Sequence, residues 1–113
     1  MGTRSGKAHW WAQRTTSIAL VPLSLWLTVG LVRHTGASHA AVVAWLHSPW
    51  AAILMILTLG TAFYHAMLGL EVVIEDYVHG PARRLASMLA VRFACVVFVV
   101  TGVFAVLRIA LSP

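Results

Sequence analysis

The chain has 113 residues, of which 60% are hydrophobic, and its mean hydropathy is +0.87. A soluble domain of this length could not bury so much apolar surface, so the composition excludes an ordinary soluble protein and indicates a membrane protein. The net charge is +5, from eight Lys and Arg against three acidic residues. The basic residues flank apolar runs and form no basic face with interleaved aromatic residues, which argues against nucleic-acid binding.

Three apolar runs are long enough to cross a bilayer, which requires about 20 residues in a helix. They predict an all-α integral membrane protein in which the whole chain, 1–113, is a single transmembrane anchor domain. The third run reaches the required length if its terminal arginines, Arg92 and Arg108, extend toward the membrane surface. The predicted transmembrane helices are at about 14–33, 49–74 and 86–111.

The segment before the first helix, 1–13, is basic and carries Trp10 and Trp11. We expect a short polar arm in the headgroup region, where indole rings are favoured. No A-x-A cleavage pattern follows the first helix, so we expect that helix to be retained in the mature chain. Pro22 lies inside the helix and is a candidate position for a kink.

The basic residues also predict an orientation. Arg33 and Arg108 lie on one side of the predicted helices, and six basic residues lie on the other. The positive-inside rule therefore predicts a cytoplasmic N-terminus and an external C-terminus. The six residues are Arg4, Lys7, Arg14, Arg83, Arg84 and Arg92.

The segment 34–48 is expected to be a loop or a partial interfacial helix. Its histidines are separated by 5 and 8 positions, so they do not share one helix face, and we interpret them as solvated loop residues. Ser48 followed by Pro49 predicts a helix start, with a hydroxyl N-cap and a proline at the first helical position. The histidines are His34, His39 and His47.

Small and apolar residues indicate how the helices pack. Gly60 and Gly69 favour close approach of neighbouring helices. Cys95, the only cysteine, lies in an apolar run and is interpreted as a packed thiol; one cysteine supports neither an internal disulfide nor an iron–sulfur cluster. Three helices are too few to enclose a transport path or a large cofactor, so we expect partner subunits.

The stretch YHAMLGLEVVIEDYVHG, residues 64–80, combines an apolar run with all three acidic residues of the chain. Within it, His65 lies in the apolar part. An ionisable side chain is costly in hydrocarbon, so a histidine there is a candidate functional residue. A neutral imidazole in a helix bundle can ligate haem iron, relay protons or hydrogen-bond a neighbouring helix, and the residues alone leave all three open.

The end of this stretch is a second candidate site. Asp76 follows His65 by eleven positions, or about 16 Å of helix, so the two lie on one stripe if the helix is unbroken. Gly80 and Pro81 stop the helix and place Tyr77 at its mouth. A phenol there can donate to a quinone carbonyl, or it can be an ordinary interfacial tyrosine beside a solvated acidic turn.

The pattern H-A-x-x-G-x-x-x-x-x-x-D-Y, from His65 to Tyr77, closely resembles the second helix of the D-type membrane anchor of succinate dehydrogenase, respiratory complex II. The stretch HWWAQRTTSIALVPL, residues 9–23, is also similar to this family, with an arginine at the cytoplasmic entrance of the first helix. The three-helix topology matches over essentially the whole chain. The different, histidine-rich signature of the C-type anchor is not found in this sequence.

The resemblance implies an anchor that pairs with a C-type cytochrome b anchor subunit and docks the iron–sulfur subunit and the flavoprotein subunit to the lipid bilayer. Succinate would be oxidised at a flavin in a soluble subunit, and this chain would help to form the pocket where ubiquinone is reduced. The chain would be a non-catalytic-core subunit of the enzyme. Its N-terminus lacks an Arg- and Ser-rich presequence, which favours a bacterial inner membrane.

The resemblance also implies roles for individual residues. His65 matches an axial ligand of a b-type haem whose other axial histidine comes from the C anchor, and Arg14 matches an arginine near the haem propionates. Tyr77 matches the tyrosine that hydrogen-bonds a ubiquinone carbonyl, with Asp76 beside it. Glu71 departs from the family, in which an uncharged residue such as glutamine is expected; it must reach the interface, pair with a basic group or be protonated.

Two other classes of function stay open. A haem-free anchor similar to that of fumarate reductase would keep the helices and the quinone pocket but have no iron ligand at His65. A proton-relaying subunit of another membrane complex would use His65 and the acidic cluster. Such a subunit is expected to have more intramembrane polar groups than this chain offers.

Overall fold

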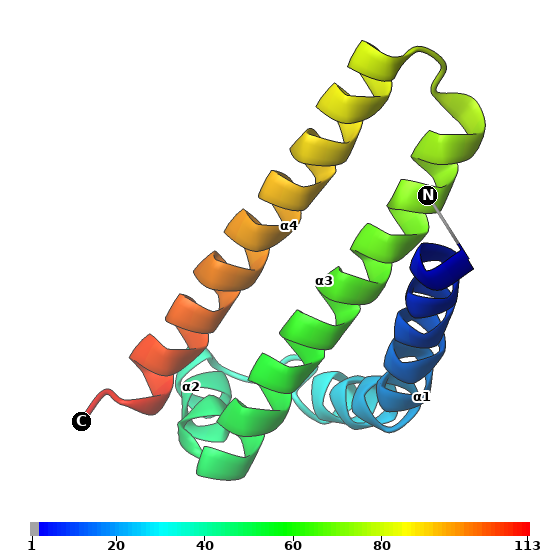
Figure 1. Ribbon diagram of the computed structural model, residues 1–113. Coiled ribbons are helices and arrows are strands. Elements are labelled where there is room, and N and C mark those ends of the chain that lie inside the picture. Colours follow the sequence, from blue (N-terminus) through cyan, green and yellow to red (C-terminus); the bar gives the residue numbers. More distant parts are fainter. Residues whose placement is uncertain (1–2) are drawn as a thin grey trace.

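The computed structural model describes residues 3–113, with side chains described from residue 6 onward, so the side chain of Arg4 lies outside the description. The described chain contains no strands. Three of its helices are long and apolar enough to cross a membrane, which confirms the predicted all-α fold with three transmembrane helices (Figure 1). The helices are α1 (Thr3–Arg33), α2 (His39–His47), α3 (Pro49–Tyr77) and α4 (Pro81–Ala110).

The first helix is longer than the sequence predicts. The predicted start of this helix at about residue 14 is wrong, because α1 is helical from Thr3 and includes most of the polar segment 1–13. At about 1.5 Å per residue this helix exceeds the hydrocarbon thickness of about 30 Å, so part of it extends into the interfacial region. Contacts with α3 support the early turns: the Nε2 atom of His9 lies 4.0 Å from a carboxylate oxygen of Glu71.

The helices α3 and α4 form an antiparallel hairpin. As predicted, Gly80 and Pro81 separate the two helices: Gly80 has φ +94°, which favours glycine, and Pro81 is the first residue of α4. Within the hairpin, the rings of Phe63 and Phe98 stack with their centroids 5.7 Å apart. A Cβ atom on Gly102 would lie 3.0 Å from the Leu59 side chain, so this glycine allows close approach.

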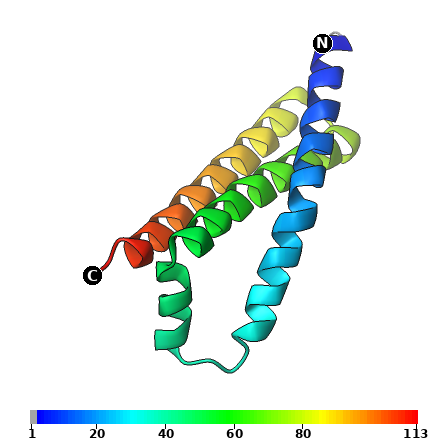
Figure 2. The same cartoon turned by 90° about the horizontal axis from the view of Figure 1, so that it is seen from below.

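The first helix lies against α3 near the N-terminal end of the chain and diverges from it toward the other end (Figure 2). The ribbon of α1 changes direction part-way along its length, and Pro22 lies inside this helix, in agreement with the expected kink. The two helices are antiparallel, because Thr16 of α1 contacts His65 of α3 whereas the earlier His9 approaches the later Glu71.

The short helix α2 connects the end of α1 to the start of α3, where these two helices have diverged (Figure 2). Its N-cap is Ser38, whose hydroxyl accepts a hydrogen bond from the Ala41 N–H at 3.2 Å. Ser48 and Pro49 begin α3 as predicted, but the Ser48 hydroxyl makes no capping hydrogen bond, so this detail of the prediction is wrong.

Two of the three histidines in this region are not simply solvated. The His34 ring stacks on Trp45 with a centroid distance of 4.4 Å, and its Nδ1–H donates to the Gly30 carbonyl at 2.7 Å. The Nε2–H of His47 donates to the Ser112 carbonyl at 2.7 Å and joins α2 to the end of α4. The half-buried His34 is therefore not a solvated residue, whereas His39 and His47 are exposed as expected but lie in the helix α2 rather than in a loop.

Most of the apolar surface of the helices is exposed in the isolated chain. Only 6% of the residues in the apolar 18-residue stretch of α4 are buried, and 22% of those in the corresponding stretch of α3. The buried apolar residues among those described form a small core rather than a sealed interior. They are Ala51, Ala52, Leu68, Ile74 and Val106. The exposed remainder requires lipid or partner proteins around it.

Candidate functional site

The side chain of His65 is held by α1. The Thr16 hydroxyl lies 2.9 Å from His65 Nδ1, 2.8 Å from the Ala12 carbonyl and 3.0 Å from the Gln13 carbonyl. A threonine in a helix commonly donates its hydroxyl proton to a carbonyl of the preceding turn, and with the proton there the oxygen accepts from Nδ1–H. A neutral His65 then carries its lone pair on Nε2.

This arrangement suits a ligand-binding imidazole. Metal-binding histidines commonly donate their other ring N–H to a fixed acceptor, which sets the tautomer and the ring orientation. Within residues 3–113, no hydrogen bond occupies Nε2 of the half-buried His65, and no group of three or more His, Cys, Asp or Glu side chains could hold a metal ion. A metal centre at His65 would therefore need its other ligands from elsewhere.

The sequence predicts that Gly60 and Gly69 let neighbouring helices approach closely. Neither glycine lies at a close helix contact among the described residues. A Cβ atom on Gly69 would meet only the Gln13 amide nitrogen, at 3.9 Å, and one on Gly60 would meet nothing within 4 Å. Gly60 instead lines an apolar hollow of about 300 Å³ between α3 and α4, beside the half-buried Cys95. Beside Gly69, the Gln13 side-chain oxygen is buried and has no hydrogen-bond partner in the described chain.

Glu71 is buried and paired with a basic group, which is one of the three possibilities that the sequence left open. Its carboxylate accepts a hydrogen bond of 2.8 Å from Arg92 Nε, and the Glu71 side chain is 8% exposed. The Arg92 side chain reaches across to α3 and is 61% exposed, and its extension toward the membrane surface stays a prediction. A cation at this distance offsets the cost of burying the carboxylate.

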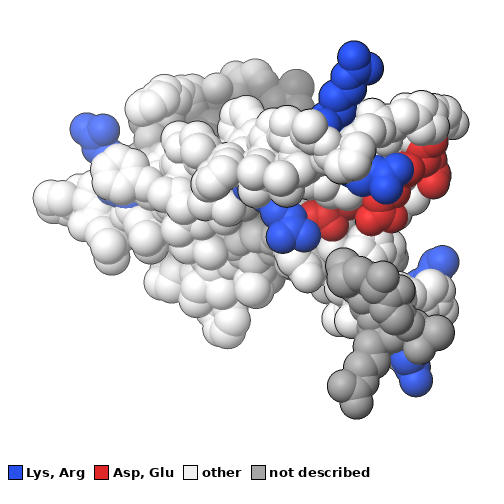
Figure 3. Space-filling model, turned by 45° about the horizontal axis from the view of Figure 1, so that its top comes forward, with Lys and Arg blue, Asp and Glu red and all other residues white. Residues whose placement is uncertain are grey.

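Asp76 and Tyr77 lie at the end of α3, on the surface of the isolated chain. Tyr77 is 76% exposed. The guanidinium of Arg84 donates to the carbonyls of Glu75 and Val78 at 3.3 and 3.4 Å, which fixes the turn that follows. Figure 3 shows the acidic side chains gathered in one region of the molecule beside basic ones. Any pocket around Tyr77 therefore needs a second wall from another molecule.

Arg14 faces outward from α1. Its guanidinium carbon lies 5.6 Å from the Trp10 ring centroid, in cation–π geometry, and the Trp10 and Trp11 rings pack edge to face at 5.1 Å. The structure thus joins His65 to Thr16 and Glu71 to Arg92. Arg14, Asp76 and Tyr77 each point away from the chain's own core.

Sequence reasoning missed the polar face of α1 that contacts α3. His9, Gln13 and Thr16 occupy positions i, i+4 and i+7, which lie on one side of a helix. This spacing was a signal that the helix begins before residue 14 and presents polar groups to a neighbour.

These features define a class of protein: a three-helix membrane anchor with apolar flanks open to lipid and partners, and with its polar contacts concentrated between α1, α3 and α4. A family model described as succinate dehydrogenase/fumarate reductase transmembrane subunit matches residues 1–99. The chain belongs to this family.

The similar proteins agree with this assignment. A succinate dehydrogenase hydrophobic membrane anchor subunit of Rickettsia bellii is 35% identical over 103 residues, covering 91% of this chain and 82% of that protein. A succinate dehydrogenase membrane anchor subunit of Reclinomonas americana is 36% identical over 93 residues, covering 80% and 78%. The hydrophobic membrane anchor subunit of Paracoccus denitrificans is 27% identical over 107 residues, covering 95% and 82%.

Proposed function

We propose that this membrane anchor of succinate dehydrogenase binds a b-type haem through His65 and forms part of the ubiquinone reduction site through Tyr77 and Asp76. Its partners would be a C-type cytochrome b anchor subunit, the iron–sulfur subunit and the flavoprotein subunit. The observation that carries the haem proposal is the Thr16–His65 contact, because it leaves the Nε2 lone pair available to iron.

The sixth ligand of such an iron must come from another chain. His65 lies in the apolar part of α3, whereas the other histidines of the sequence lie near helix ends or between helices. A histidine of the C anchor would complete the pair, and the exposed flanks of the transmembrane helices offer surface for that subunit. The bound haem would supply one-electron chemistry.

Arg14 would pair with a haem propionate. Its guanidinium is exposed and contacts only the face of Trp10 among the described residues, so its hydrogen-bond donors are available for a carboxylate. Arginine matches a carboxylate with two parallel donors, and such pairs are strong at the edge of a membrane.

Tyr77 would donate its O–H to a carbonyl of ubiquinone, and Asp76 would make the mouth of the pocket polar. Both lie at the end of α3 and are exposed in the isolated chain, which is consistent with a site completed by the iron–sulfur subunit. This end would face the cytoplasm of a bacterial inner membrane, because the positive-inside rule predicts that side for the N-terminus and for Arg83 and Arg84 in the first turn of α4.

A spectrum of the purified complex tests the haem proposal. His65→Leu should abolish or alter the low-spin haem absorption, while the matched variant His39→Leu, on exposed α2, should leave it unchanged. A normal, fully occupied spectrum in His65→Leu would assign His65 to helix packing. A wild-type complex without haem would favour the haem-free, fumarate-reductase-like anchor, and succinate-driven charge movement across vesicles would favour a proton-relaying role.

A further inference from the structure

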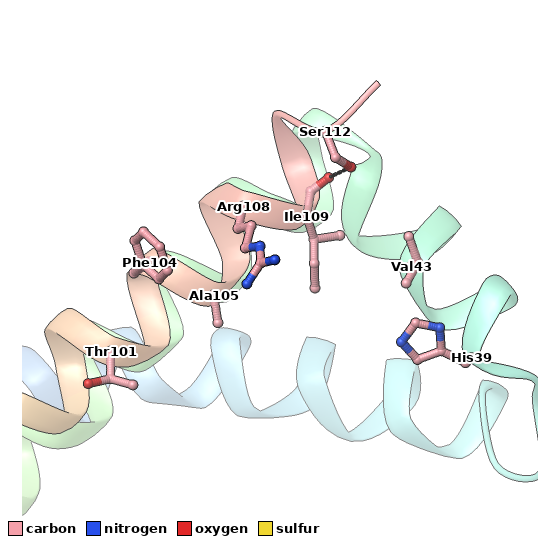
Figure 4. A pocket seen from close by; sticks show the side chains of 8 residues that line it. All are labelled: His39, Val43, Thr101, Phe104, Ala105, Arg108, Ile109 and Ser112. Carbon is pink, nitrogen blue, oxygen red and sulfur yellow. Dashed lines mark hydrogen bonds between the residues drawn. The ribbon is translucent and has the colours of Figure 1, made fainter.

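A hollow of about 580 Å³ lies between α2 and the end of α4, remote from the acidic end of α3 (Figure 4). Its walls are mostly apolar: Val43 from α2 faces Phe104, Ala105 and Ile109 from α4. Two polar groups enter the same space from opposite helices, the guanidinium of Arg108 and the imidazole of His39. None of these residues has a role in the proposed haem or quinone site.

The hollow has a fixed shape. The His47 Nε2–H donates to the Ser112 carbonyl at 2.7 Å and ties α2 to the residues that follow α4. The Ser112 hydroxyl in turn donates to the Ile109 carbonyl at 2.7 Å, as Figure 4 shows. The first hydrogen bond joins the two walls, and the second closes the C-terminal turn of α4.

The charge of Arg108 has no counter-ion in the described chain. The three acidic residues of the sequence are Glu71, Glu75 and Asp76, and all of them lie near the other end of the hairpin. His39 adds a ring N–H donor in any protonation state, and as the first residue of α2 it lies at the positive end of the helix dipole. The hollow therefore favours an anion that brings its own apolar body.

We propose that an anionic phospholipid binds in this hollow, with its phosphate on Arg108 and His39 and an acyl chain along Phe104, Ala105 and Val43. A lipid satisfies both parts of the site, whereas a free phosphate would leave the apolar walls without a partner. The position also suits a lipid, because α4 is long and apolar enough to span a membrane and Arg108 lies in its last turn, where arginines commonly reach the headgroups.

The test uses the intact complex in detergent, stripped of lipid and then titrated with phosphatidylglycerol or phosphatidylcholine, with bound lipid counted by native mass spectrometry. The wild type should retain phosphatidylglycerol in preference to phosphatidylcholine. Arg108→Gln should weaken phosphatidylglycerol binding roughly five- to tenfold and remove the preference. Arg33→Gln is the matched control, since Arg33 is exposed at the end of α1 and does not line the hollow.

A second variant tests the contribution of the apolar space separately from that of the Arg108 charge. Ala105→Trp keeps Arg108 but fills the space, and it should also reduce phosphatidylglycerol binding, while inorganic phosphate should not compete with the lipid. Equal binding of both lipids by the wild type, or unchanged binding by Arg108→Gln, would overturn the proposal. Displacement by inorganic phosphate would make it a phosphate site instead. A photo-crosslinking residue at position 104 that couples to another subunit and never to lipid would identify the hollow as a subunit interface.

Discussion

The Thr16 hydroxyl on α1 lies 2.9 Å from Nδ1 of His65 on α3, and the two residues are 49 positions apart in the sequence. When the hydroxyl donates to a carbonyl of its own helix, its oxygen is an acceptor for the imidazole N–H. One contact therefore joins two transmembrane helices and sets the tautomer of the histidine. In the proposed haem site Thr16 is a positioning residue that acts through His65.

Replacing Thr16 with Val should weaken haem binding about 10- to 100-fold, the usual cost of losing the group that orients a metal-binding histidine. Valine has nearly the same shape but no acceptor oxygen, so the imidazole loses its fixed orientation. A spectroscopic haem titration of the complex, together with the midpoint potential, measures the effect.

Thr16→Ser is the matched control and should restore both quantities, because serine keeps the hydroxyl. A Thr16→Val complex that has wild-type affinity and potential would show that the hydrogen bond does not act on the haem. Loss of haem in both variants would point to helix packing rather than to the tautomer.

The Glu71–Arg92 pair predicts an effect on stability. Arg92→Leu should destabilise the assembled subunit by roughly 1–3 kcal/mol, because it leaves the buried Glu71 carboxylate without its hydrogen-bonded cation and with only His9 nearby, at 4.0 Å. The value is below that of a fully buried pair, since the Arg92 side chain is 61% exposed. The thermal unfolding midpoint of the detergent-solubilised complex gives the change.

A double-mutant cycle isolates this interaction. Arg92→Leu combined with Glu71→Leu should recover most of the lost stability, because the carboxylate is removed along with its partner. Strictly additive losses in the double variant would show that the two side chains do not interact in the assembled complex.

The three transmembrane helices could be predicted because hydropathy depends on composition over about 20 residues. The limits of α1 could not be predicted in the same way. Its first turns are polar, and they are stabilised by α3, through contacts such as that between His9 and Glu71. The sequence also left α2 open between a loop and a partial helix. This helix is short, and its own Trp45 holds it in place by packing over Gly30 of α1.

The candidate site could likewise be predicted only in part from the sequence. His65 could be identified because an imidazole in an apolar run is costly and therefore informative. Its partner Thr16 could not, because a hydroxyl is common in membrane helices and only the crossing of α1 and α3 brings the two side chains together. The sequence likewise left the state of Glu71 open, because pairing with Arg92 depends on the register of α3 against α4.

Arg14→Gln should lower the midpoint potential of the haem by some tens of millivolts. Removing a cation near the propionates stabilises the more positive, oxidised iron relative to the reduced form. Trp10→Leu is a suitable control, because it removes the cation–π contact of Arg14 but leaves the charge in place. A redox titration that gives the same potential for Arg14→Gln and the wild type would place the propionates near another cation.

Tyr77→Phe should weaken stabilisation of the bound quinone by about 1–3 kcal/mol, the cost of leaving a buried carbonyl without its donor. The phenol of Tyr77 is exposed and has no hydrogen-bond partner among the side chains described, residues 6–113, so the substitution should leave the fold of this chain intact. Quinone reduction should therefore fall, while succinate oxidation with an artificial electron acceptor continues at the wild-type rate.

The comparison of these two assays on one preparation decides the role of Tyr77. An equal loss in both would indicate a defect of assembly, and no loss in either would make Tyr77 an ordinary interfacial aromatic residue. His79→Gln is a useful companion variant. His79 is exposed in the turn after α3, and the proposed quinone site does not use it as a hydrogen-bond donor. If His79→Gln lost quinone reduction and Tyr77→Phe did not, the hydrogen-bond donor to the quinone would be the imidazole.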